Sequence, residues 1–128
     1  MSAGGGGDRN AIPLYDLPDY QVIYNRLLEM PIRTSAIRAL GGYANVWAIE
    51  CFMDELATQA GTDPMKLRLS LINHESSRKV LMAVAEMSNW GKVQPGRARG
   101  LAFCIAFGVP VAQVIEVEDT SAGLRMTG

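Results

Sequence analysis

Residues 33–50 read RTSAIRALGGYANVWAIE and join a basic loop, broken by two glycines, to the start of an amphipathic helix. The free amides at a helix N-terminus favour a bound anion. Acidic side chains are usually preferred near a helix N-terminus, and an arginine opposes that preference. Arg38 therefore makes sense there if one anion is bound by both its guanidinium and the helix N-terminus. Gly41 and Gly42 permit a positive φ or a close ligand approach at the same point. Spacing alone leaves a second reading open, a plain turn flanked by solvated arginines.

The composition fits one soluble globular unit. The 128 residues, 48% of them hydrophobic, are enough for one core and too few for two ordinary domains. The formal charge of −1, without a block of Lys and Arg, argues against nucleic acid and anionic membranes as partners. No apolar run is long enough to span a bilayer, and nothing distinguishes the cytoplasm from the periplasm. We expect Cys51 and Cys104 to be buried thiols, since neither has metal-ligand neighbours.

The order of patterns along the chain predicts an α+β fold. A flexible glycine-rich lead (1–10) precedes a single domain (11–128), which starts with an extended, proline-punctuated segment and a strand at 20–28. Three consecutive helices follow: 44–61; 64 to 71 or 72, restarted by Thr62-Asp63-Pro64; and one capped by Ser76 or Ser77 and running through Met87. After a turn-rich stretch (92–100), an antiparallel strand pair is expected at 101–107 and 109–117, with Gly108 and Pro110 marking a bulge or turn between the strands and a tight turn at 119–123.

Charged side chains on these elements have mostly bland interpretations. Glu50 and Asp54 lie one helical turn apart and would suit paired carboxylates, but a solvated helix face explains them more simply. The alternation around Glu116 predicts that this carboxylate faces water. His74 is expected in a surface turn. No metal-ligand spacing, phosphate loop or nucleophile motif occurs.

Several runs of sequence together resemble one protein family. They read PIRTSAIRALG at 31–41, ANVWAIE at 44–50, MDELA at 53–57 and AGTDP at 60–64, with Arg68; GGGGDRNAIPLYD at 4–16, GRARG at 96–100 and VAQV at 111–114 extend the match. These runs resemble the large, molybdopterin-binding subunit of the xanthine dehydrogenase and aldehyde oxidase family of molybdenum hydroxylases, and most of all the isoquinoline 1-oxidoreductase β subunits.

The resemblance implies roles for a few residues of the loop. Arg38 stands where the family's loop arginine contacts the molybdenum cofactor, and Ala36, Ile37 and Gly41 share that cofactor-binding loop. Leu40 stands where a phenylalanine touches substrate, so an aromatic substrate has no ring to stack on here. The implied cofactor is molybdopterin, as the cytosine dinucleotide, with molybdenum. No catalytic or metal-ligating residue is assigned.

The resemblance also implies that the chain is part of a larger molybdopterin-binding domain. Family enzymes use a general-base glutamate near their far C-terminus and further glycine-rich loops around the pterin, and these have no counterpart here. We therefore expect a piece of an oxidoreductase catalytic subunit that retains no cofactor and is inactive alone. Its partners would be the remainder of the large subunit and an iron–sulfur small subunit. Exposed strands within residues 101–117 would also permit a homodimer.

Two other functions remain open at this stage. The first is a separately expressed interaction module of a split enzyme. The second is a free-standing small-molecule-binding protein, which one loop and one helix equip with few converging polar groups.

Overall fold

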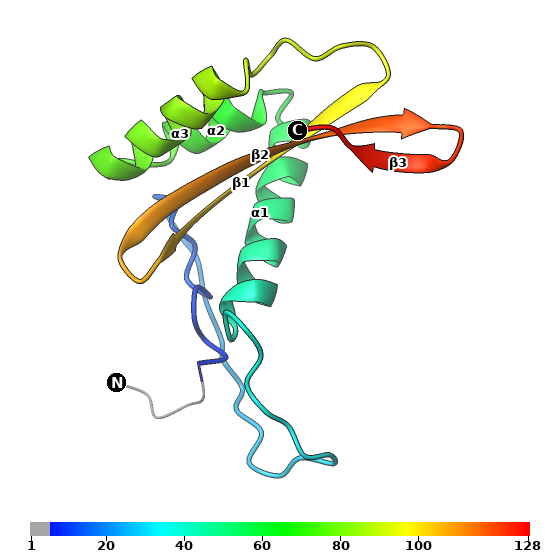
Figure 1. Ribbon diagram of the computed structural model, residues 1–128. Coiled ribbons are helices and arrows are strands. Elements are labelled where there is room, and N and C mark those ends of the chain that lie inside the picture. The colour runs from blue at the N-terminus through cyan, green and yellow to red at the C-terminus, as the bar shows by residue number, and fades with distance from the viewer. Residues whose placement is uncertain (1–5) are drawn as a thin grey trace.

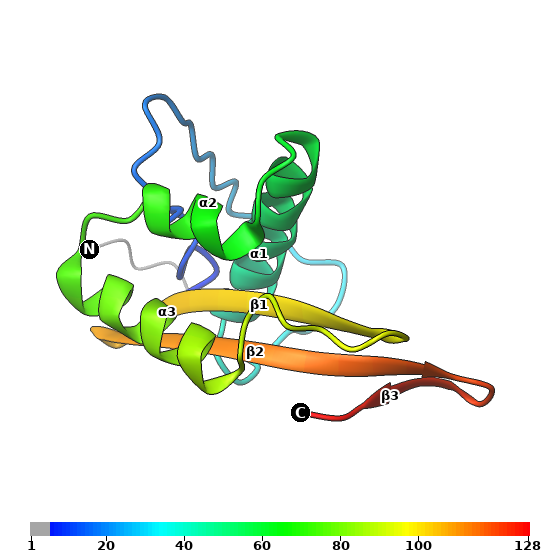
Figure 2. The same cartoon turned by 90° about the horizontal axis from the view of Figure 1, so that it is seen from above.

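Three helices precede three strands, as expected for an α+β chain. The computed structural model describes residues 6–128, so positions 1–5 of the expected lead, with Gly4 and Gly5, lie outside the described residues. The elements are α1 (Gly42–Gln59), α2 (Pro64–Ser70), α3 (Glu75–Met87), β1 (Arg97–Ala106), β2 (Val109–Thr120) and β3 (Gly123–Met126). The strands form one antiparallel sheet in the order β1-β2-β3. Figures 1 and 2 show α1 crossing beside β1 and α3 lying along β2.

Local signals place the ends of α1 and α2. The amides of Gly61 and Thr62 donate back to Thr58 and Ala57, and Gly61 has φ 60°, so α1 ends in a Schellman motif. The Asp63 carboxylate caps α2 by accepting from the Lys66 amide at 2.9 Å, and Pro64 occupies the first turn. The expected restart between the two helices is confirmed.

The start of α3 differs from the expected cap. His74 is the N-cap residue and Glu75 already belongs to the helix, where its carboxylate suits the positive end of the helix dipole. Ser77 lies inside the helix, buried, with its hydroxyl 2.8 Å from Nδ1 of the exposed His74. The prediction that Ser76 or Ser77 caps this helix was therefore wrong, because the helix begins at Glu75 and Ser77 is buried within it.

The sheet is larger than the sequence pattern indicated. β1 begins at Arg97, within the stretch expected to be turn-rich, and joins β2 through Phe107 and Gly108, whose φ values are both positive, as in a tight hairpin turn. β2 continues to Thr120, which pairs with Gly123, so the turn after it is shorter than expected and a third strand follows. The turn expected at Gly108 is confirmed, whereas Pro110 lies inside β2, where it pairs with Ile105.

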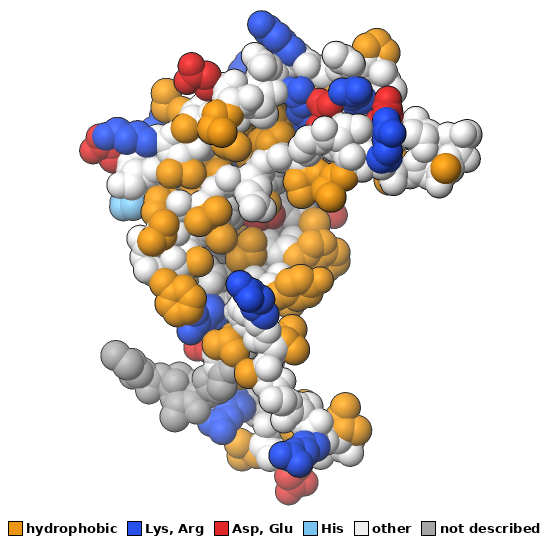
Figure 3. Space-filling model, in the orientation of Figure 1, with side chains coloured by type: hydrophobic (Ala, Val, Ile, Leu, Met, Phe, Trp, Pro, Cys, Tyr) orange, Lys and Arg blue, Asp and Glu red, His pale blue; other side chains and the backbone are white. Residues whose placement is uncertain are grey.

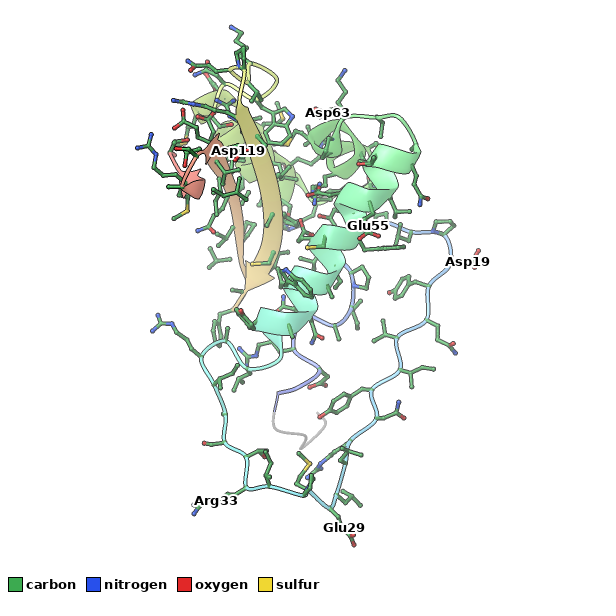
Figure 4. All side chains as sticks on the ribbon, turned by 90° about the vertical axis from the view of Figure 1, so that its right-hand side faces the viewer. Asp19, Glu29, Arg33, Glu55, Asp63 and Asp119 are labelled. Atoms are coloured by element: carbon green, nitrogen blue, oxygen red, sulfur yellow. The ribbon has the colours of Figure 1, made fainter. Side chains whose placement is uncertain are left out.

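Residues 20–38 form a projecting loop, and the strand expected at 20–28 is not present in it. No regular element occurs between residue 20 and the start of α1. In Figure 4, Glu29 and Arg33 lie at the far end of this loop, away from the helices and the sheet. Apolar residues such as Ile23 and Leu28 are exposed along it. Aromatic and β-branched residues favour a strand only where a neighbouring strand and a packed face receive them, and the described chain supplies neither here.

The core lies between the helices and one face of the sheet. Its buried members come from the N-terminal segment, all three helices or their connections, and β1: Tyr15, Met53, Met65, Ile72, Leu81, Leu101 and Phe103. The expectation of two buried thiols was wrong for Cys51, which is exposed on α1, and Cys104 is half-buried. Among residues 6–128, no helix is both long and apolar enough to cross a membrane.

Candidate functional site: a loop at the start of α1 and the polar cluster behind it

The N-terminal segment is bonded to the start of α1. The Gly41 amide donates to the Gly6 carbonyl at 2.9 Å, and the Asn45 side-chain amide donates to the carbonyls of Gly7 and Arg9, both at 2.9 Å. A Cβ on Gly41 would lie 2.1 Å from the Gly7 oxygen, which no side chain tolerates. Gly41 therefore permits a close approach of two backbone segments at the point where we expected a ligand.

The positive φ expected at the glycine pair occurs just before it. Gly41 has φ −64° and Gly42 is the first residue of the helix, whereas Ala39 and Leu40 have φ 66° and 54°. Two consecutive residues with a Cβ in this conformation are strained by about 1–2 kcal/mol each. Such strain persists where the surroundings enforce it, and it is often found at ligand sites. Leu40 is half-buried, and its side chain packs against Gly6.

The other predicted cofactor residues are exposed on the loop. Ala36, Ile37 and Arg38 all face solvent. Within residues 6–128, Arg38 has no hydrogen bond or ion pair, and the first turn of α1 holds no acidic residue. The loop therefore presents a guanidinium that is available to an anionic or hydrogen-bond-accepting ligand.

Behind the loop, the buried side chains of Tyr15, Glu50 and Arg68 form a polar cluster with the half-exposed carboxylate of Asp54. The Arg68 guanidinium donates from Nε to Glu50 Oε2 at 3.0 Å and from Nη1 to Asp54 Oδ1 at 2.7 Å. The Tyr15 hydroxyl donates to the other oxygen of Glu50 at 2.6 Å, and the Phe103 amide donates to Oε2 at 2.9 Å. Arg68 is 0% exposed and Glu50 5%. The cluster thus ties the N-terminal segment, α1, α2 and β1 together at one carboxylate.

Burial and charge set the protonation states in this cluster. Burial, followed by the negative charge of Glu50, raises the pKa of Tyr15 far above its usual 10.0, so the phenol remains a donor. Burial, the largest single effect, would lower the pKa of Arg68, but the charge of Glu50 together with Tyr15 and with the hydrogen bond and charge of Asp54 outweighs it, so the pKa of Arg68 is raised. The cluster is consequently a neutral phenol beside a charged pair, which suits a structural role.

The solvated reading of Glu50 was wrong, and the sequence held a signal against it. Glu50 lies four residues after Val46, three before Met53 and seven before Ala57, so it falls within the apolar stripe of α1. A carboxylate on such a stripe needs a buried cationic partner. Arg68 supplies it, and nothing local in the sequence pairs those two positions.

A second set of charges surrounds Glu116 on β2. Glu116 is buried, contrary to expectation, and accepts from Arg97 at 2.8 Å, from Arg99 at 2.7 Å and from the Thr127 hydroxyl at 3.2 Å. The hydrogen bond from Arg99 is the main reason that the pKa of Glu116 is lowered. Alternation predicted the wrong environment because Arg97 and Arg99 cover the same face of the sheet. Nowhere in the described chain do three His, Cys, Asp or Glu side chains form a metal-binding group.

Comparison with known proteins points to a cofactor family. The family model described as the molybdopterin cofactor-binding domain matches residues 9–72, half of the chain. A subunit of the nicotinate dehydrogenase of Pseudomonas putida is 34% identical over 84 residues, covering 66% of this chain and 7% of that protein. A membrane-bound aldehyde dehydrogenase of Gluconacetobacter polyoxogenes, named for pyrroloquinoline quinone, is 28% identical over 104 residues, covering 68% of this chain and 13% of that protein. The matched region is therefore a small part of each relative.

Proposed function

Because the chain belongs to the molybdopterin cofactor-binding domain family, we propose that it is a piece of the catalytic subunit of a molybdenum hydroxylase and forms part of its cofactor site. The observation that carries this proposal is Arg38, an exposed arginine without an intramolecular partner among the described residues. It lies within the region matched by the family model and shortly before a helix N-terminus that lacks an acidic residue.

The donors on the loop fit part of such a cofactor. A molybdopterin dinucleotide carries a pyrophosphate and a pterin ring with hydrogen-bonding edges, and guanidinium and backbone N–H groups suit both. Ala36, Ile37 and Arg38 are exposed on one short segment, followed by the strained pair Ala39 and Leu40. The chain's share of the site would be to bind and orient the cofactor through Arg38 and neighbouring backbone.

The redox chemistry would come from the bound molybdenum centre, and we assign no proton-transfer role to residues 36–41. We assign the substrate-facing position to Leu40. Its aliphatic side chain would limit the shape of a substrate by contact and would not stack on an aromatic ring. We further propose molybdopterin cytosine dinucleotide as the cofactor form, the isoquinoline 1-oxidoreductase β subunits as the family branch, and an aldehyde or N-heterocycle as the substrate.

We assign the polar cluster a positioning role behind this loop. Glu50 lies two turns into α1 and is held by Tyr15, which follows the turn at Gly6 to Asn10. The same carboxylate is fixed to α2 by Arg68. The start of α1 and the N-terminal turn are therefore held in one arrangement by contacts at both ends.

We propose that the remainder of the large subunit and an iron–sulfur subunit complete the enzyme, and that the chain is inactive alone. The test is co-expression of this chain with the related nicotinate dehydrogenase subunit of Pseudomonas putida, from which the matched region has been removed. Molybdenum by mass spectrometry and pterin by fluorescence are then measured on the purified complex. We expect both to be retained by the complex, and neither by the chain alone.

Two arginines on the projecting loop give a matched pair of variants. Arg38→Ala should lower the retained molybdenum and pterin about tenfold, since a charge-assisted hydrogen bond contributes about 1.5–3 kcal/mol. Arg33→Ala, at the far end of the loop in Figure 4, should leave both unchanged. Equal effects of the two variants would contradict the role of Arg38. Turnover of an aldehyde or N-heterocycle by the chain alone, with an electron acceptor, would contradict the need for partners, and bound pyrroloquinoline quinone would contradict the choice of cofactor.

The alternative of a separately expressed interaction module predicts a different result. Such a module would co-elute with partner chains in gel filtration while Arg38→Ala left cofactor retention unaffected.

A further inference from the structure

One edge of the sheet is covered by side chains. On β1, the Phe103 amide donates to Glu50, the Leu101 carbonyl accepts from Arg68, and the Ile105 carbonyl accepts from the Asn10 side chain at 2.9 Å. These three backbone groups point away from β2. Between Leu101 and Ile105, side chains therefore occupy the outer edge of β1 where a further strand would pair.

The same geometry shows which groups of β2 point outward on the opposite side. Leu101, Phe103 and Ile105 face Val114, Ala112 and Pro110 in the β1–β2 register. In an antiparallel ladder, pairs of facing residues alternate between those that hydrogen-bond to each other and those that do not. In a pair that does not, the N–H and C=O groups of both residues point outward, away from the other strand. The amides and carbonyls of Ala112 and Val114 therefore point away from β1, as does the carbonyl of Pro110.

The segment after β2 covers this edge only as far as Glu116. The Thr127 amide donates to the Glu116 carbonyl at 2.9 Å, and the Glu116 amide donates to the Gly128 carbonyl at 2.8 Å. From Val114 to Pro110, no strand of the described chain lies beside β2 on this side. In Figure 2 the trace from β3 runs back alongside β2 toward α3. The direction of a strand that would complete this edge is therefore already set.

The space beside this edge is open, with apolar side chains on α3 and β2 and a charged pair at one end. A cavity of about 360 Å³ opens between α3 and β2 and is lined by Val84, Met87, Ser88, Val114, Arg99, Glu116 and Gly128. On the other face of the sheet, Val111 and Ile115 are exposed. Because side chains alternate along a strand, a residue opposite Val114 would point into the cavity, and residues one and three positions away from it would cover Ile115 and Val111 on the other face. Figure 3 shows several hydrophobic side chains exposed, among polar ones, on the face that α3 and the sheet present in that view.

We propose that the edge of β2 from Pro110 to Val114 is a docking site for an extended apolar strand of the remainder of the large subunit, added antiparallel to β2 and in line with β3. The identity of that source rests on the proposed function, whereas the pairing rests on the backbone geometry alone.

Pro110 argues against a second copy of the chain as the occupant. Two β2 strands paired about Ala112 would place Pro110 of each copy opposite Val114 of the other. Proline has no N–H, so each Val114 carbonyl would remain without a donor, and Thr127 and Gly128 would limit the paired length. A partner strand without proline at that position would satisfy both groups of Val114. Pro110 thus blunts the edge against self-association and leaves it open to a different strand.

The experiment extends the chain after Gly128 with Thr-Val-Thr-Val-Thr-Val-Thr and measures amide hydrogen exchange by NMR. A tethered segment experiences an effective concentration on the order of millimolar, which compensates for modest affinity. We expect the Ala112 and Val114 amides to exchange at least about tenfold more slowly than in the chain without the extension. The control extension carries proline in place of each valine and should give no protection.

Two internal amides report on folding in the same spectra. Gln113 and Ile115 donate toward β1, so their exchange should be equal in all variants. Equal exchange of Ala112 and Val114 with the valine and proline extensions would overturn the proposal. If the Ala112 and Val114 amides of the chain without an extension exchanged more slowly as the protein concentration rose, a second copy of the chain would be the occupant and the proposed one would be wrong. Neither measurement involves molybdenum or pterin, so the inference and the cofactor role fail independently.

Discussion

The buried pair of Arg68 and Glu50 gives the most demanding prediction. Arg68→Met keeps the bulk and removes the charge, which leaves a carboxylate that is 5% exposed without its cation. Breaking a buried pair in this way costs about 3–5 kcal/mol. Glu50 keeps the donors of Tyr15 and Phe103, so we expect a loss near the lower end, about 3 kcal/mol. That is a large part of the roughly 5–15 kcal/mol that stabilises a domain.

The assay is urea denaturation followed by far-ultraviolet circular dichroism at pH 7. Lys79→Met is the matched control, because Lys79 pairs with Glu75 at 2.6 Å while both side chains are more than 70% exposed. An exposed helical pair contributes only about 0.3–0.5 kcal/mol. The double variant Glu50→Gln with Arg68→Met should lose less than the sum of the single losses, by at least about 1 kcal/mol, since the stranded charge is gone. A loss for Arg68→Met within about 1 kcal/mol of the control would refute the reasoning.

Three further predictions concern single positions. Gly41→Ala should lower the free energy of unfolding by more than about 2 kcal/mol, because its Cβ would meet backbone at 2.1 Å, whereas Gly100→Ala, with open space around it, should stay within about 0.5 kcal/mol by the same urea assay. Because the pKa of Tyr15 is raised on folding, the contribution of Tyr15 to stability is present below pH 10 and is lost as the pH rises above 10. The stability of Tyr15→Phe, measured by fluorescence during alkaline unfolding, should therefore depend less on pH in that range than the stability of the parent chain. Because the pKa of Glu116 is lowered on folding, the contribution of Glu116 to stability is present above about pH 4.5 and is lost as the pH falls below that value. Glu116→Gln should therefore make stability depend less on pH in the acid range, and an unchanged acid dependence would contradict the ion pair with Arg99.

The candidate loop was found from the sequence, but part of its explanation changed. Arg38 is exposed and Leu40 half-buried, as a loop at a helix start permits. Gly41 was singled out because glycine allows close approach, and the partner that approaches is the backbone of Gly7. Sequence spacing identifies a crowded position without identifying what crowds it. That identity depends on the N-terminal turn folding back onto α1, a contact between segments far apart in the sequence.

The sequence by itself determined the elements whose causes are local. The apolar period of α1, the glycine that ends it, the Asp63-Pro64 start of α2 and the turn at Gly108 all act within a few residues. Tertiary structure decided what depends on distant partners: the burial of Glu50 by Arg68 and that of Glu116 beside Arg99, and the absence of a strand at 20–28. The reason is that local propensity is set by backbone and neighbouring side chains, whereas burial of a charge or pairing of a strand needs a group that only the folded chain brings near.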